Sequence, residues 1–148
     1  MALKQQISED MKAALRARES ARLATLRLLL AAMKQKEVDE RTELEDADVL
    51  AILEKMVKQR RESIAQFEKA GRTDLADNER SEIAVLEGYL PQKLSEAELA
   101  EAVEKALAES GASTVRDMGK AMALLKARLA GRADMAQVSA LVKARLSG

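Results

Sequence analysis

The chain has 148 residues, enough for one domain of ordinary size or for two small helical units. It contains neither cysteine nor histidine, which excludes disulfides, thiolate nucleophiles, imidazole bases and the usual zinc and iron ligands. Lys and Arg number 25 and are balanced by 25 Asp and Glu, while aromatic residues make up only 1% of the chain. The abundance of Ala and Leu favours helices over strands.

The first helices follow from apolar spacing. Apolar residues recur every four positions from Leu3 to Leu15, as on one face of a helix, and predict a helix over residues 2–17. A second apolar stripe, from Leu23 to Met33, predicts the next helix.

Two further helices are expected before the only proline. Asp46 is a suitable N-cap for a long third helix that stops at Gly71. Thr73 is expected to cap a fourth helix that ends near Gly88.

A linker is expected over residues 88–94. Pro91 disfavours helix at the residue before it, and Ser95 with Glu98 forms a capping-box pattern that starts a new helix. Three shorter helices are then expected over residues 96–109, 115–130 and 134–146, separated by Gly111 and Gly131. We therefore predict an all-α protein with an N-terminal long-helix bundle, residues 1–90, and a small C-terminal three-helix tail domain, residues 91–148.

The sequence gives no sign of a membrane span. The longest run without a polar residue, from Leu28 to Met33, is far too short to cross a bilayer. Lys4 lies near the N-terminus with no apolar segment behind it. We therefore expect a cytoplasmic protein without a membrane partner.

An acidic stretch before the third helix could hold a hard cation such as Mg²⁺. The alternative is that its carboxylates favour the turn and complement the dipole of the helix that follows. We favour the alternative and expect no metal ion, because no calcium-loop spacing with a central glycine is present. The stretch comprises Glu37, Asp39, Glu40, Glu43, Glu45, Asp46 and Asp48.

Two basic regions are candidates for contact with phosphate groups. In the third helix, Glu54 and Glu62 lie within pairing distance of the cations, so we favour a solvated or internally paired face there. From Arg116 onward, seven basic residues face two acidic ones, a net charge of +5. The cations of the third helix are Lys55, Lys58, Arg60 and Arg61.

The basic tail could bind nucleic acid or could be an ordinary lysine-rich surface. Its apolar residues fall on one helix face and are expected to form a core, which leaves the rest of the circumference positively charged. Phe67 and Tyr89 cannot supply the aromatic platform on which single strands stack, so a folded RNA fits the composition better. Without a glycine-rich phosphate loop, a nucleophile elbow or a metalloprotease motif, we expect no catalytic residue and no cofactor.

Three segments together resemble the YqeY family, and the resemblance covers nearly the whole chain. The tail also resembles the C-terminal domain of the B subunit of the amidotransferase that amidates misacylated glutamyl-tRNA or aspartyl-tRNA. In that enzyme, as the resemblance implies, the tail grips the tRNA. The segments are 58–63 leading to Phe67 and 70–75, then Tyr89-Leu90-Pro91, and finally 117–120 leading to 131–134.

The resemblance is most specific in the tail, where Gly119, Lys120 and residues 131–134 match the motif position by position. Gly131 is expected to end one helix, and Asp134 to cap the next, which puts Arg132 in a tight, exposed turn. The chain departs from the family at the position after this Asp, where it carries methionine instead of glycine.

The resemblance implies a tRNA-binding or amidotransferase-related accessory protein. The large catalytic domain of the B subunit has no counterpart here, so we do not expect catalysis by the chain alone, although the family is associated with carbon-nitrogen ligase activity that uses glutamine as amido donor. An amide-forming ligase acting with other subunits and a helical protein–protein adaptor are the alternatives. We expect tRNA or another folded RNA, amidotransferase subunits or another protein as partners, and no DNA. The predicted RNA-binding residues are Lys120, Lys126, Arg128 and Arg132.

Overall fold

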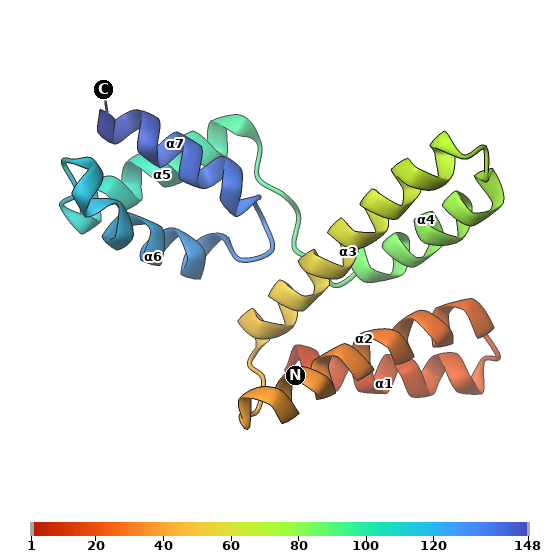
Figure 1. Cartoon of the computed structure of the whole chain (residues 1–148). Helices are drawn as coiled ribbons and strands as arrows, with labels where there is room; N and C mark the ends of the chain where they lie inside the picture. The colour runs from red at the N-terminus through yellow and green to blue at the C-terminus, as the bar shows by residue number, and fades with distance from the viewer. Residues whose placement is uncertain (1, 148) are drawn as a thin grey trace. The chain divides into compact units, whose positions relative to one another are not determined.

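The computed structural model describes residues 2–147, and this part of the chain contains seven α-helices, one short 3-10 helix and no strand (Figure 1). The predicted all-α class is confirmed. The chain divides into two compact units, the first ending at Pro91 and the second beginning at Gln92. The division into two domains, residues 1–90 and 91–148, stays a prediction.

The first unit consists of two helical hairpins. Helices α1 (Leu3–Arg16) and α2 (Ser20–Glu40) form the first, and α3 (Asp46–Lys69) and α4 (Thr73–Glu87) form the second (Figure 1). Helix α2 packs against both α3 and α4, so the hairpins share one apolar core. The side chains at its centre are at most 1% exposed: Ile7, Leu26, Leu29, Met33, Val49, Leu53 and Leu86.

The turn between α3 and α4 explains one of the recognisable segments. Gly71 has a φ of +70°, and its N–H donates to the carbonyl of Glu68 at 3.1 Å. The N–H of Arg72 donates to the carbonyl of Phe67 at 2.8 Å. These two bonds are the Schellman arrangement that closes a helix on a left-handed residue, as predicted for Gly71.

The predicted N-caps Asp46 and Thr73 are wrong by one residue. Each is the first residue of its helix, and the caps are Glu45 and Arg72. Asp46 accepts the backbone N–H of Leu3 at 2.9 Å instead, so its carboxylate ties the start of α1 to the start of α3.

Tyr89 fastens the segment after α4 to α1. Its hydroxyl donates to Asp10 Oδ2 at 2.6 Å, and Tyr89 and Leu90 pack against the core of the first unit. Burial, followed by the hydrogen bond to Asp10, raises the pKa of Tyr89 above its ordinary value. Tyr89-Leu90-Pro91, another recognisable segment, therefore has a structural role.

The second unit contains three mutually packed helices, α5 (Glu96–Ser110), α6 (Met118–Leu129) and α7 (Met135–Ser147), and the 3-10 helix η1 (Val115–Asp117). The predicted capping box starts α5, because Glu98 N–H donates to Ser95 Oγ at 3.2 Å and Ser95 N–H donates to Glu98 Oε1 at 3.1 Å. The core side chains are Leu99, Val103, Ala106, Ala121, Leu125, Leu129, Ala133, Val138 and Val142. No helix between residues 2 and 147 is long and apolar enough to span a membrane.

Candidate nucleic-acid interface

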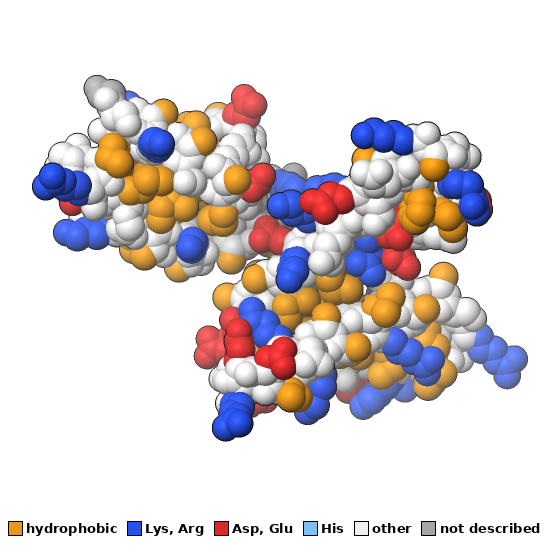
Figure 2. Space-filling model, in the orientation of Figure 1, with side chains coloured by type: hydrophobic (Ala, Val, Ile, Leu, Met, Phe, Trp, Pro, Cys, Tyr) orange, Lys and Arg blue, Asp and Glu red, His pale blue; other side chains and the backbone are white. Residues whose placement is uncertain are grey.

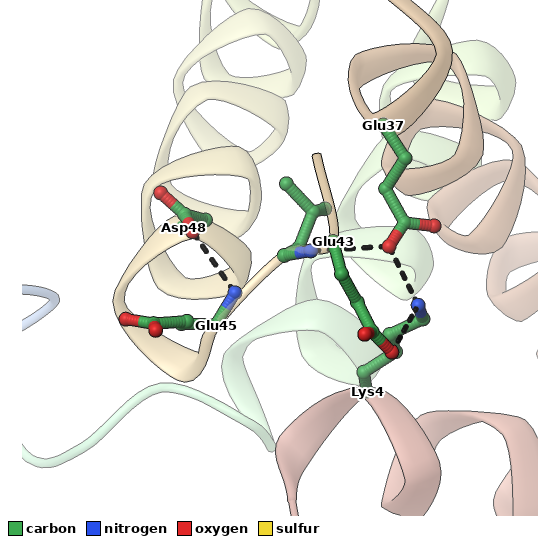
Figure 3. Close-up of polar contacts among 6 residues, drawn as sticks. Lys4, Glu37, Glu43, Glu45 and Asp48 are labelled. Carbon is green, nitrogen blue, oxygen red and sulfur yellow. Dashed lines mark hydrogen bonds and ion pairs between the residues drawn. The ribbon is translucent and has the colours of Figure 1, made fainter. Parts of the chain in front are cut away.

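The acidic stretch is occupied by contacts within the chain (Figure 3). Glu37 Oε2 accepts hydrogen bonds from Lys4 Nζ at 2.6 Å and from the N–H of Leu44 at 3.1 Å. Lys4 Nζ also lies 3.7 Å from Glu43 Oε1. The hydrogen bond from Lys4, followed by that from Leu44, holds the pKa of Glu37 below its ordinary value. These carboxylates thus join the α2–α3 loop to α1, and residues 2–147 contain no acidic group arranged to hold a metal.

The arginines of α3 hold α4 in place. Arg60 Nε donates to Glu82 Oε2 at 2.7 Å, and the Arg60 side chain is only 13% exposed. Arg61 pairs with Glu87 at 2.7 Å. Internal pairing, one of the two outcomes favoured for this basic region, is therefore found for both arginines, through carboxylates of α4 that the sequence did not indicate.

The four predicted RNA-binding residues fall into two groups. Lys120 and Lys126 are exposed on α6 and form no hydrogen bond or ion pair with any residue that the structure describes. The N–H groups of Ser113 and Thr114 lower the pKa of Asp117, and the charge of Lys120 adds to this effect. Arg128 is paired with Glu109 of α5. Arg132 is also engaged within the tail unit, so only the two lysines are left free to meet a ligand.

Arg132 is not the exposed turn residue that the sequence predicts. It is half-buried, its Nε donates to the carbonyl of Gln92 at 3.0 Å, and its own carbonyl accepts the N–H of Leu94 at 3.0 Å. It therefore fastens the segment before α5 to the α6–α7 turn. The rest of that turn follows the prediction, since Gly131 has a φ of +76° and Asp134 caps α7 by accepting the N–H of Ala136 at 2.9 Å.

The solvent-exposed face of α6, which we call its outer face, consists of small residues and has a lysine on each side. Gly119, Ala123 and Ala127 are exposed at successive four-residue steps, and Lys120 and Lys126 lie to either side, about 120° apart around the axis. A Cβ added at Gly119 would meet no atom within 4 Å, so packing within the chain does not require glycine there. Glycine in a helix costs roughly 0.5–1 kcal/mol relative to alanine.

The charge of the tail is smaller in the folded unit than in the sequence segment. From Gln92 onward, nine Lys and Arg stand against seven Asp and Glu, a net charge of +2. The difference from +5 arises in α5, whose glutamates also pair with Arg128 and Arg145. The acidic residues of α5 are Glu96, Glu98, Glu101, Glu104 and Glu109.

A second basic region lies in the α1–α2 hairpin, and the sequence interpretation missed it. Residues 12–36 contain seven Lys and Arg but only one acidic residue, Glu19, a net charge of +6. Figure 2 shows basic side chains spread along this hairpin to its tip. A running sum of charge over the first forty residues would have found the region. We call four exposed members the hairpin cations: Arg16, Arg18, Arg27 and Lys34.

These features define a small all-helical protein with two compact units, each carrying a basic surface. The chain belongs to the Yqey-like protein family, which it matches over residues 4–146. It is 36% identical over 106 residues to Altered inheritance of mitochondria protein 41, mitochondrial, of Lachancea thermotolerans, with 70% of this chain and 57% of that protein covered. It is 40% identical over 85 residues to the protein of the same name from Eremothecium gossypii, with 57% of this chain and 46% of that protein covered.

An uncharacterized protein of Schizosaccharomyces pombe is 35% identical over 81 residues, which cover 55% of this chain and 66% of that protein. The chain spans about half the length of the first curated relatives it matches. The prediction of a cytoplasmic protein is contradicted, because several relatives are named as mitochondrial proteins. That prediction relied on the lack of an apolar segment near Lys4. Mitochondrial targeting segments are amphipathic rather than apolar, so the lack of an apolar segment does not distinguish a cytoplasmic from a mitochondrial protein.

Proposed function

We propose that the protein is an RNA-binding accessory protein of the amidotransferase type, which contacts folded RNA, tRNA in the first place, through the outer face of α6. The observation that carries this proposal is the pair of free lysines, Lys120 and Lys126, beside a face made of glycine and alanine. Small side chains allow a sugar-phosphate backbone to approach the helix closely. The two ammonium groups can then reach phosphates on either side of it.

The mode of binding that this face favours is electrostatic and independent of base sequence. Lysine acts on a phosphate as a point charge on a flexible stem and carries no geometric code for a base. The chain has one phenylalanine and one tyrosine, and Tyr89 is hydrogen-bonded to Asp10, so few aromatic side chains are available for base stacking. Recognition would depend on the shape and backbone of a folded RNA.

The role proposed for amide chemistry is indirect. The chain has no cysteine for releasing ammonia from glutamine, and the sequence carries no phosphate-binding loop. Carbon-nitrogen ligase activity with glutamine as donor is therefore proposed only for an assembly with other subunits, in which this chain would hold the RNA.

The decisive experiment measures tRNA affinity as a function of salt for the wild type and for a variant with Lys120→Gln and Lys126→Gln. Each lost phosphate contact should reduce the slope of log affinity against log salt by about 0.7–0.9, so the double variant should lose about one to two units. Glutamine keeps the helix propensity of lysine, so the helical content should not change.

The matched control replaces Lys93 and Lys105 in the same unit, which removes the same charge from outside α6. Its slope should stay near that of the wild type. Equal losses in the two variants would show that only net charge matters and would overturn the α6 site. Wild-type protein that binds no folded RNA would overturn the function itself, and the helical adaptor would take its place.

A further inference from the structure

The hairpin cations form no ion pair with a carboxylate that the structure describes, unlike six of the thirteen arginines of this chain. Arg16, Arg18 and Arg27 form no hydrogen bond or ion pair among residues 2–147. Lys34 forms none either, although its charge acts on Glu37, three positions further along α2. By contrast, the arginines at 60, 61, 72, 80, 128 and 145 are each paired with a carboxylate. An unpaired guanidinium is fully available to a phosphate, which it can bind through two parallel N–H bonds.

The hairpin cations are spread along the hairpin and do not converge on a point. Arg27 and Lys34 are seven residues apart on α2, which puts them roughly 10 Å apart along the axis and within about 20° around it. On α1, Arg16 points about 180° away from the buried Ile7. From Arg18 in the turn to Lys34 the cations extend over roughly 24 Å. Such a row suits successive phosphates of a backbone better than a single small anion.

The apolar surface of the hairpin argues against a lipid surface as the partner. A helix that lies in a membrane interface needs a broad apolar face turned toward the lipid. Here the broad apolar faces of α1 and α2 are buried in the core, and Leu15, Leu28 and Val38 are the large apolar residues left exposed on these helices. No aromatic residue lies in the hairpin, so bases cannot stack on it either.

We infer that the α1–α2 hairpin is a second binding surface, which takes the phosphate backbone of a double-helical segment of folded RNA. The inference rests on the proposed RNA binding in its choice of ligand, but it assigns the contact to a different unit from α6. The cations of the two hairpin helices contact the backbone, and the apolar faces behind them keep the hairpin fixed in the first unit.

The test replaces three hairpin cations in the full chain, with Arg16→Gln, Arg27→Gln and Lys34→Gln. All three lie within helices on exposed positions, and glutamine has a similar helix propensity. The affinity for a hairpin-shaped RNA is measured against salt. We expect the slope of log affinity against log salt to fall by about two to three units, because three phosphate contacts are lost. The urea midpoint should stay unchanged.

The matched control removes three charges from α3 of the same unit, with Lys55→Gln, Lys58→Gln and Lys69→Gln. This variant should keep the wild-type slope. An equal loss in both triple variants would overturn the inference, as would a hairpin variant that binds RNA like the wild type. The hairpin variant tests the hairpin surface, and the α6 double variant tests the α6 surface. If the salt slope of RNA affinity falls in only one variant, that surface is supported and the other is overturned.

Two further ligands complete the experiment. Duplex DNA of the same sequence tests whether the backbone is recognised as RNA, and vesicles with anionic lipids test the lipid surface. Because an A-form RNA duplex presents its phosphates in a different geometry from DNA, we expect the hairpin substitutions to weaken RNA binding more than DNA binding. Equal weakening of both would overturn the choice of RNA as the ligand. If they abolish vesicle binding and leave RNA binding intact, the inference is wrong and the hairpin is a membrane-binding element.

Discussion

The α1–α2 hairpin and the tail helices both contain a basic stretch of sequence, but in the folded protein their cations differ in how many have a partner within the chain. In the tail unit, Arg128 and Arg145 meet glutamates of α5, and Arg132 is engaged by a backbone carbonyl. In the hairpin, Arg16 and Arg27 meet no carboxylate. Midway along α1, Glu9 pairs with Lys12 and Asp10 accepts the hydroxyl of Tyr89. At the other end of the hairpin, Glu37 is engaged by Lys4 and by the N–H of Leu44.

The comparison shows that the charge of a segment is not the charge of a surface. The tail segment has +5, but the unit that contains it has +2 because α5 contributes its glutamates. Residues 12–36 have +6, but the whole α1–α2 hairpin, residues 3–40, has eight Lys and Arg against six Asp and Glu, a net charge of +2. Within it, Lys12 pairs with Glu9 and Lys36 pairs with Glu40, whereas Arg16, Arg18 and Arg27 have no carboxylate partner among the described residues. Partners chosen by the fold therefore decide which cations remain available to a ligand.

The largest effects on stability should come from replacing a large core side chain in each region by alanine. Leu29 in the hairpin and Leu125 in the tail are both 0% exposed, and replacing such a leucine by alanine typically costs about 2–5 kcal/mol. If the units unfold independently, Leu125→Ala should shift only the tail transition, and Leu29→Ala only that of the first unit. Urea unfolding followed by circular dichroism measures both transitions, and Tyr89 absorbance reports the first unit alone.

A single shared transition that moves equally in both variants would contradict independence. The comparison between hairpin and tail would then concern two faces of one cooperative body. Either result leaves the charge argument intact, because the pairing of the cations does not depend on how the units unfold.

The elements with local signals were predictable from the sequence. The αL positions at Gly71, Gly111 and Gly131, and the capping box at Ser95, are set by residues a few positions apart. The pairing of the basic residues was not predictable. Arg132 bonds to a carbonyl 40 positions away, and no pattern of residues within α6 or α7 indicates it. Two of the four predicted RNA-binding residues, Arg128 and Arg132, thus form tertiary contacts that the sequence does not indicate.

A smaller effect is expected at Tyr89, which gives the first unit its own spectroscopic reporter. The chain has one tyrosine and no tryptophan, so alkaline absorbance titration follows this hydroxyl alone. Its raised pKa means that folded protein should ionise above pH 10, whereas urea-unfolded protein should ionise near 10. Since the folded pKa is the higher one, this contribution to stability is complete below about pH 10 and is lost as the pH rises further.

Two variants sharpen that result. Asp10→Asn should bring the folded pKa of Tyr89 back toward its ordinary value, because the negatively charged acceptor of its hydrogen bond is gone. Tyr89→Phe should lower the free energy of unfolding by about 1–2 kcal/mol through loss of the same bond. A folded protein whose tyrosine titrates normally would show that α4 is not fastened to α1 in this way, and the basic hairpin would lack that anchor.

The smallest expected effect separates charge from conformation at the tip of the hairpin. Arg18 has a φ of +57°, where a glycine avoids the clash of a Cβ with the backbone. Arg41, which ends α2, has a φ of +52° and is also exposed, but it lies next to the acidic stretch. Arg18→Gly and Arg41→Gly therefore remove the same charge and relieve the same strain at opposite ends of one helix pair.

Both glycine variants should be more stable than the wild type by about 0.5–1 kcal/mol, because relief of the left-handed strain exceeds the entropy that glycine adds to the unfolded chain. A higher urea midpoint with an unchanged m-value measures this gain. Their effect on RNA should differ. Arg18→Gly should flatten the salt slope by about 0.7–0.9, one phosphate contact, while Arg41→Gly should leave it unchanged. Equal flattening would mean that the RNA senses only the net charge of the chain, and the division of the hairpin into a basic binding end and an acidic structural end would fail.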